Sequence, residues 1–139
     1  MDAAPTRTTI LIIDPHKADR EYWTQRLNMS SPDYVVLEAE TGKAGLLICR
    51  QHRVDCVLVE TSLPDMSGFE VLIDLVKRTR HAQMAVIFLT RLALYPMTDL
   101  AIKNGAQEYL VKSHISGDIL DWAIQKAIFA VAFKNVHLS

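Results

Sequence analysis

The fold of this chain is decided by the stretch Val54-Asp55-Cys56-Val57-Leu58-Val59-Glu60-Thr61-Ser62-Leu63-Pro64-Asp65-Met66-Ser67-Gly68. Its apolar run, residues 56–59, is short and rich in β-branched residues, which is typical of a strand buried on both faces of a parallel sheet. The run ends at one carboxylate, Glu60, and a turn containing Pro64 and Gly68 follows. Parallel α/β sheets hold their ligands at the carboxyl ends of the strands, so Glu60 is either a functional residue or simply the first solvated residue after a strand.

Short apolar runs and amphipathic segments alternate along the rest of the chain. We expect strands at residues 8–13, 34–39, 56–59, 85–89 and 107–111, helices at residues 17–29, 42–52, 69–79 and from 118 to about 133, and a partly helical segment at residues 91–104. Helices between successive strands imply parallel strands joined by right-handed crossovers, with helices on both faces of the sheet. The sequence therefore predicts an α/β, flavodoxin-like (βα)5 three-layer sandwich whose five-stranded parallel sheet has the order 2-1-3-4-5.

Apolar residues recur at helical spacing in four of the expected helices, which predicts the face that each one buries. Ser67 and Glu70 have the pattern of a capping box, and Asn104-Gly105 is a helix-stop signal. The residues at helical spacing are Ala18, Tyr22, Trp23, Arg26 and Leu27 in the first helix and Phe69, Leu72, Ile73 and Val76 in the third. The expected apolar face of the second helix is Ala44, Leu47 and Ile48, and the expected inner stripe of the last is Ile119, Leu120, Ala123, Ile124, Ala127 and Ile128.

The composition is that of an ordinary globular chain of one domain. The chain has 139 residues and a formal net charge of −1, without the basic excess expected for direct nucleic-acid binding. Cys49 and Cys56 are expected to be buried free thiols, and there is neither a signal-peptide pattern nor a membrane-length apolar run, so we expect a cytoplasmic protein without membrane contact. We expect a flexible tail at residues 1–7, one domain at residues 8–134, and at residues 135–139 a tail or the start of a linker to a further domain.

Four of the expected strands end in a residue that can bind a cation or an anionic group: Asp14, Glu60, Thr90 and Lys112. In the predicted strand order all four converge at one edge of the sheet. Each also has a simpler interpretation, with Asp14 as a helix N-cap, Thr90 as a β-branched strand residue and Lys112 as a solvated loop residue. Their joint placement on neighbouring parallel strands favours a site that binds a phosphoryl group or a cation.

Five motifs support a family resemblance: Ile10-Leu11-Ile12-Ile13-Asp14, Ala39-Glu40-Thr41-Gly42-Lys43-Ala44, Leu63-Pro64-Asp65-Met66-Ser67-Gly68, Val86-Ile87-Phe88-Leu89-Thr90 and Gly105-Ala106-Gln107-Glu108-Tyr109-Leu110-Val111-Lys112. With these motifs the chain resembles the receiver domain of two-component response regulators, the CheY-like fold, over residues 8–133.

The resemblance implies a phosphorylation site and a switch. In the family, an Asp at the end of the third strand accepts a phosphoryl group from a histidine kinase, and an acidic pair after the first strand holds Mg²⁺. Thr90 and Lys112 occupy the positions that bind phosphoryl oxygens, and Tyr109 that of an aromatic residue which swings inward as the Thr moves. This movement remodels the face formed by residues 91–104, the strand 107–111 and the last helix, where a signalling kinase or an output domain or protein would bind.

The phosphorylation site departs from the family pattern at two places. Glu60 stands where the acceptor Asp belongs, and its carboxylate lies one methylene, about 1.5 Å, further out. Phosphoryl transfer depends on positioning, so this displacement is costly. Asp14 is followed by Pro15 instead of a second acidic residue, so a magnesium site of Asp14 and Glu60 is expected to be weak or lost, and no other cofactor is expected.

Two further departures flank the site. Arg91 follows Thr90 where the family prefers a small residue, and is placed either to cover the pocket or to pair with Glu60. Ser113 follows Lys112 where the family usually has Pro, often with a cis bond, so this loop is expected to differ.

The departures together predict an atypical receiver, or pseudo-receiver, that is not an enzyme and is not phosphorylated in the ordinary manner. Glu60 would stand in for phospho-aspartate by reaching Lys112 or Thr90. Two alternatives stay open: a non-switching dimerisation or docking domain of a larger signalling protein, and a receiver that is phosphorylated in an unconventional way. An enzyme or flavin protein on the same fold has little support, because no phosphate-binding loop follows the first strand and no nucleophile–base pair is visible.

The last helix raises a separate question, because residues 128–133 are apolar on several sides. They mark a homodimer contact, a helix that continues into a further domain, or an ordinary core helix that frays. A homodimer through the face of residues 91–104, the strand 107–111 and the last helix is the other expected assembly.

Overall fold

The computed structural model describes residues 7–78 and 84–138, and their side chains except those of Arg78 and of residues 134–138. The expected N-terminal tail therefore lies outside the described residues except for Arg7, as does the expected end of the third helix at Thr79.

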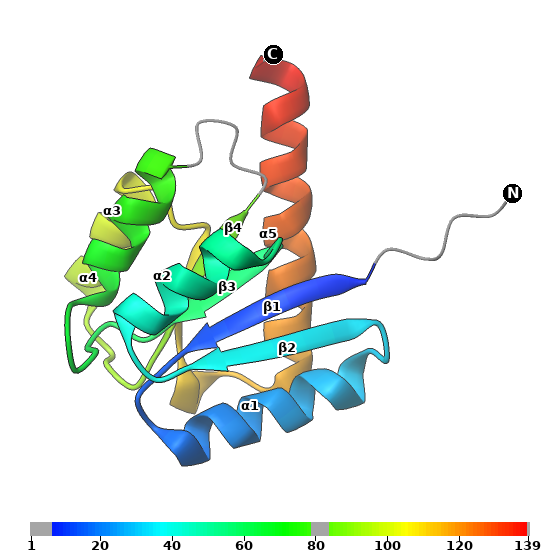
Figure 1. Ribbon diagram of the computed structural model, residues 1–139, viewed down its shortest axis with the longest axis vertical. Helices are drawn as coiled ribbons and strands as arrows, with labels where there is room; N and C mark the ends of the chain where they lie inside the picture. Colours follow the sequence, from blue (N-terminus) through cyan, green and yellow to red (C-terminus); the bar gives the residue numbers. More distant parts are fainter. Residues whose placement is uncertain (1–6, 79–83, 139) are drawn as a thin grey trace, which may run out of the picture.

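The sheet has five parallel strands in the order β2-β1-β3-β4-β5, which confirms the predicted topology (Figure 1). β1 and β3 are central neighbours, with Ile10 paired with Cys56 and Ile13 with Val59. The strands are β1 Thr8–Ile13, β2 Tyr34–Ala39, β3 Cys56–Val59, β4 Ala85–Thr90 and β5 Glu108–Val111.

Helices cover both faces of the sheet and make a three-layer sandwich. α1 and α5 contact one core cluster together with Ile10 and Ile12, whereas α3 and α4 contribute to a second cluster with Leu11 and Ile13. Successive residues of β1 thus point to opposite faces and are buried on both, which is why the strand is a continuous apolar run. The helices are α1 Lys17–Ser30, α2 Gly42–Gln51, α3 Gly68–Arg78, α4 Tyr95–Lys103 and α5 Gly117–Leu138, and a short 3-10 turn, η1, spans Lys112–His114.

The predicted buried face of α2 is only partly right, because Ile48 is half-buried against the second core cluster but the other two predicted residues are exposed. Leu47 is half exposed and Ala44 is exposed, whereas Gly42 and Gly45 are buried. A Cβ atom on Gly45 would lie 2.3 Å from Cδ1 of Ile13, so the backbone of α2 approaches the sheet where only glycine fits. With the glycine backbone against the sheet, Ala44 and Leu47 face outward, while Leu46, Ile48 and Cys49 are half-buried against the core.

The predicted faces of α1, α3 and α5 are only partly right. In α1 and α3 the buried stripe is rotated relative to the predicted spacing, whereas in α5 Leu120, Ala123, Ile124 and Ala127 are buried as predicted. The buried stripe consists of Arg20, Trp23 and Leu27 in α1 and of Val71, Leu72 and Leu75 in α3. The residues at the predicted spacing that are exposed are Ala18, Tyr22, Arg26, Ile73, Val76 and Ile119.

Local signals at helix ends are confirmed. The Ser67 N–H donates to the Glu70 carboxylate at 2.8 Å and the Glu70 N–H donates to the Ser67 hydroxyl at 3.2 Å, which makes a capping box at the start of α3. α4 is followed by Asn104 and by Gly105, whose φ of 108° is a conformation that favours glycine.

α5 is the longest helix, and its C-terminal turns project beyond the sheet in Figure 1. The domain boundary expected at residue 134 falls inside this helix, which continues to Leu138. Within the described residues, no helix is long and apolar enough to cross a membrane.

We predict that Gly68→Ala destabilises the fold, because an added Cβ atom would lie 2.3 Å from the carbonyl oxygen of Glu60, and the Gly68 N–H already donates to the carbonyl oxygen of Thr61 at 2.8 Å. Overpacking of this kind costs about 1–3 kcal/mol, and it is measured by urea unfolding. Gly117→Ala is the control, since its added Cβ atom would lie 3.1 Å from the nearest atom, Cβ of Arg26, and so would be crowded much less. Equal unfolding midpoints for the two variants would contradict the prediction.

Candidate functional site

The ends of four strands bring together the residues that the sequence pointed to. Asp14, Glu60 and Thr90 follow or end β1, β3 and β4 and are buried, and Lys112, directly after β5, has a side chain that is only 9% exposed. Glu60 itself is 4% exposed, so it is not a solvated residue after a strand. The strand order alone places these side chains at one edge of the sheet.

The ammonium group of Lys112 lies among three carboxylates. Its Nζ donates to Asp14 Oδ2 at 2.5 Å, to Asp19 Oδ2 at 2.7 Å and to Glu60 Oε2 at 2.9 Å. These contacts use all three of its N–H donors. Burial opposes the charged form of Lys112, but the hydrogen bonds to the three carboxylates outweigh it and raise the pKa of Lys112.

Glu60 accepts hydrogen bonds on both carboxylate oxygens. Oε1 accepts from the Thr61 N–H at 2.8 Å, from the Thr61 hydroxyl at 3.2 Å and from the Thr90 hydroxyl. Oε2 accepts from Lys112 and from the Arg91 N–H at 3.2 Å. Burial opposes ionisation, but the hydrogen bonds from Thr90 and Lys112 and the charge of Lys112 hold the pKa of Glu60 below its ordinary value.

Thr90 and Tyr109 are connected through Leu92. The Thr90 hydroxyl oxygen accepts from the Leu92 N–H at 3.0 Å, and the Tyr109 hydroxyl donates to the Leu92 carbonyl at 2.8 Å. Tyr109 is half-buried, with its ring centroid 5.8 Å from that of Phe88. Burial, together with the nearby charge of Glu60, raises the pKa of Tyr109. The backbone of Leu92 thus contacts both residues expected to form a switch.

Arg91 forms an ion pair with a residue that sequence reasoning missed. Its Nε and Nη2 donate to Asp19 at 2.9 Å and 3.1 Å, and its backbone N–H contacts Glu60. Of the two alternatives for Arg91, side-chain pairing with Glu60 is therefore wrong. Asp19 lies in the first turn of α1, where acidic residues are common, and this was the available signal. The hydrogen bond from Arg91 lowers the pKa of Asp19 to about 2. Burial opposes this shift, and Lys112 adds to it.

Arg91 and Ser113 lie at the mouth of the site. Both line a pocket of about 340 Å³ together with Asp19 and Lys112. Ser113, which follows Lys112, is in the η1 turn. Arg91 therefore bridges the segment after β4 and α1 across the opening above Lys112.

Asp14, His16 and Asp19 each place one potential ligand atom within 4.8 Å of the others. The oxygens are already engaged: Asp14 Oδ1 contacts the His16 N–H and Nδ1 at 2.8 Å each, while Asp14 Oδ2 and Asp19 Oδ2 contact Lys112. Mg²⁺ requires octahedral oxygen ligands and keeps several waters. With an ammonium group at the centre of the carboxylates, this arrangement does not fit a hydrated magnesium ion.

The start of α1 depends on Asp14 in a way that differs from an N-cap. The residue before α1 is His16, and it has no side-chain capping bond. Asp14 instead accepts from the His16 N–H, and its own carbonyl oxygen accepts from Arg20 Nη1 at 2.8 Å. Arg20, a buried residue that sequence reasoning also missed, therefore fixes the end of β1 beside Lys112.

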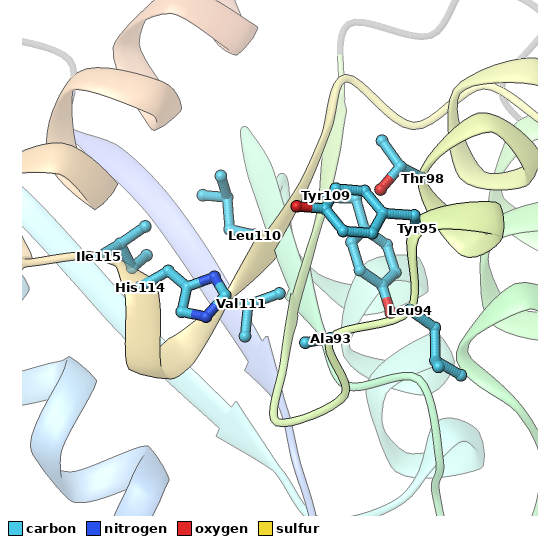
Figure 2. A pocket seen from close by; sticks show the side chains of 9 residues that line it. All are labelled: Ala93, Leu94, Tyr95, Thr98, Tyr109, Leu110, Val111, His114 and Ile115. Carbon is cyan, nitrogen blue, oxygen red and sulfur yellow. The ribbon is translucent and has the colours of Figure 1, made fainter.

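A second pocket, of about 250 Å³, lies beside Tyr109. In Figure 2, Leu94, Tyr95 and Thr98 lie on one side of the view, with the ring of Tyr109 overlapping that of Tyr95, and Val111 and His114 lie on the other. Tyr109 thus belongs both to the contacts that begin at Glu60 and to the wall of a surface pocket.

Comparisons with known proteins agree on one family. A sequence model described as "Response regulator receiver domain" matches residues 10–123. The chain is 30% identical over 131 residues to the nitrate/nitrite response regulator protein NarL of Escherichia coli, covering 94% of this chain and 57% of NarL. It is 28% identical over 106 residues to histidine kinase P4 of Formosa agariphila, covering 76% of this chain and 8% of the kinase. The chain thus spans less than two thirds of these curated relatives.

A solved structure supports the same fold. The crystal structure of a response regulator receiver domain protein from Clostridium thermocellum superposes with a TM-score of 0.80 at 31% sequence identity, and the match covers 91% of this chain and 98% of that one.

We predict that Asp19→Asn lowers the stability of the fold at neutral pH and that this difference from the native chain disappears in acid. The pKa of Asp19 is lowered from 3.8 to about 2, so the stabilisation is complete above 3.8 and is lost as the pH falls toward about 2. Urea midpoints of both proteins at several pH values between 7 and 2 measure the difference. A difference that stays constant over this range would show that the charge of Asp19 does not stabilise the fold.

Proposed function

This chain belongs to the response regulator receiver family and is a receiver domain of two-component signal transduction, and from this premise we propose that Glu60 acts as a permanent internal substitute for phospho-aspartate. The observation that carries the proposal is the pair of contacts from the Glu60 carboxylate to the Thr90 hydroxyl and to Lys112 Nζ. These are the two positions that the family resemblance assigns to phosphoryl oxygens.

Ordinary phosphorylation is disfavoured by the same contacts. An attacking carboxylate oxygen needs a free lone pair in line with the phosphorus atom, and positioning is the main source of catalysis in phosphoryl transfer. Both oxygens of Glu60 already accept hydrogen bonds, from five donor groups in all. The Arg91–Asp19 ion pair at the mouth of the site narrows the approach to Glu60.

The output of the domain is proposed to be a protein contact and not a reaction. The face of α4, β5 and α5, with its pocket beside Tyr109, is proposed to bind a signalling kinase or an output domain or protein. A homodimer through this face, or through α5, belongs to the same proposal. The two free cysteines, Cys49 and Cys56, are consistent with a reducing compartment such as the cytosol.

We predict that the native chain gains no phosphoryl group from a small-molecule phosphodonor with Mg²⁺, as measured by intact mass. The double variant Glu60→Asp with Arg91→Ala should gain one, because the shorter acid withdraws from Thr90 and the ion pair at the mouth is removed. The single variant Glu60→Asp separates the two effects, since its adduct reports side-chain length alone.

A phosphoryl adduct on the native chain would overturn the proposal, and mapping the modified residue would show which unconventional acceptor is used. If the double variant gains an adduct while the single variant does not, the Arg91–Asp19 ion pair blocks the reaction even when the acceptor is an Asp.

We predict that Glu60→Gln, which keeps the side-chain length and removes the charge, speeds amide hydrogen exchange at Thr61, Arg91 and Leu92. The Thr61 and Arg91 N–H groups donate directly to the Glu60 carboxylate, and hydrogen bonds to a charged acceptor are the stronger ones. Glu70→Gln is the matched control, because Gln preserves a capping box. Unchanged exchange after Glu60→Gln would instead favour the non-switching docking domain.

A further inference from the structure

α5 carries two apolar stripes, of which the protein's own core uses only one. Leu120, Ala123, Ile124 and Ala127 are buried against the sheet. A second stripe consists of Ile119, Trp122, Phe129 and Phe133, which are 48%, 62%, 70% and 53% exposed, and the exposed Lys126 lies between them. We call these five residues the outer stripe.

The outer stripe has the spacing of a helix-pairing seam. Its residues follow one another at intervals of three, four, three and four, which is the a/d pattern of a heptad repeat. This 3.5-residue average keeps the stripe on one side of the helix over four turns. The residues beside it at 130 and 132 are exposed alanines, which leave room for the backbone of a second helix to approach.

Lys126 does not place an unpaired charge in the middle of the stripe. Its Nζ lies 4.9 Å from the centroid of the Trp122 ring and 3.9 Å from a carboxylate oxygen of Glu108 on β5. The charge is therefore balanced within one copy, and the aliphatic stem is free to cover apolar surface. In a two-fold interface the same patch of surface lies on both sides, and because Glu108 accompanies Lys126 in each copy, the two patches do not bring unbalanced cations together.

From the spacing and the charge balance we propose that the outer stripe is a homotypic interface, through which two copies of this chain pair α5 against α5. The inference deepens the proposed function, because it assigns the dimer contact to α5 and not to the pocket beside Tyr109. With about 150–250 Å² per aromatic side chain, and roughly half to two thirds of each exposed, two stripes together bury on the order of 1,000 Å². This area is at the lower end for specific interfaces, so the dimer should depend on concentration.

The proposal is tested on the full chain by sedimentation velocity and light scattering over a concentration series. The mass of the native chain should rise from 15.7 kDa toward twice that value. Phe129→Glu should raise the dimer dissociation constant about tenfold or more, and so should Trp122→Ala, which guards against an effect specific to the introduced charge. Both side chains are mostly exposed, so circular dichroism and urea midpoints should match the native chain.

Two matched controls replace exposed apolar residues elsewhere, namely Leu47→Glu on α2 and Tyr95→Ala beside the second pocket. Both should dimerise like the native chain. A native chain that is monomeric at every concentration would overturn the proposal, as would a dimer that Phe129→Glu leaves intact or that Tyr95→Ala disrupts instead. The Glu60 proposal is tested separately, by intact mass and amide hydrogen exchange at concentrations where the chain is monomeric. Failure of one proposal therefore does not affect the other.

Discussion

The rest of the site depends on the ion pairs that the ammonium group of Lys112 makes with three carboxylates. A buried charge is tolerated only when it is paired, and Lys112 pairs with carboxylates from β1, α1 and β3 while itself following β5. Three carboxylates and one ammonium group would leave an excess of negative charge, which Arg91 reduces by pairing with Asp19. Removing Lys112 would leave Asp14 and Glu60 buried without the ammonium group that both contact, so β1 and β3 depend on the residue that follows β5.

The extra methylene of Glu60 decides what this charge cluster can do. It lets one carboxylate contact the Thr90 hydroxyl with one oxygen and Lys112 with the other. A reaction at either oxygen would first have to break hydrogen bonds to a charged group, each worth about 1.5–3 kcal/mol. Under the proposed function, the same length that places the carboxylate where a phosphoryl group's oxygens are expected also makes it a poor nucleophile.

The sequence predicted the sheet and the meeting of Asp14, Glu60, Thr90 and Lys112 because both follow from backbone periodicity. Continuous apolar runs identify strands buried on two faces, and parallel strands bring their ends to one edge. It did not predict the buried face of α2, which depends on how closely the Gly45 backbone approaches Ile13. Nor did it predict that Arg91 pairs with Asp19, because these residues are 72 positions apart and the pairing depends on where α1 packs. The sequence pattern thus predicted where the site lies. Which charged residues pair within it could be seen only once the packing of the helices was known.

A series of hydrogen bonds links Glu60 to the surface pocket beside Tyr109, and no phosphoryl group takes part in it. Glu60 contacts Thr90, Thr90 contacts the Leu92 N–H, and the Leu92 carbonyl contacts Tyr109, which lines the pocket shown in Figure 2. Such a series transmits a signal only if it has a second arrangement that some event favours. A carboxylate that belongs to the chain cannot be removed by a phosphatase, so the Glu60 end of the series stays constant. What can vary is assembly, and a weak α5 interface would make the concentration of the protein, instead of its phosphorylation, the regulated quantity.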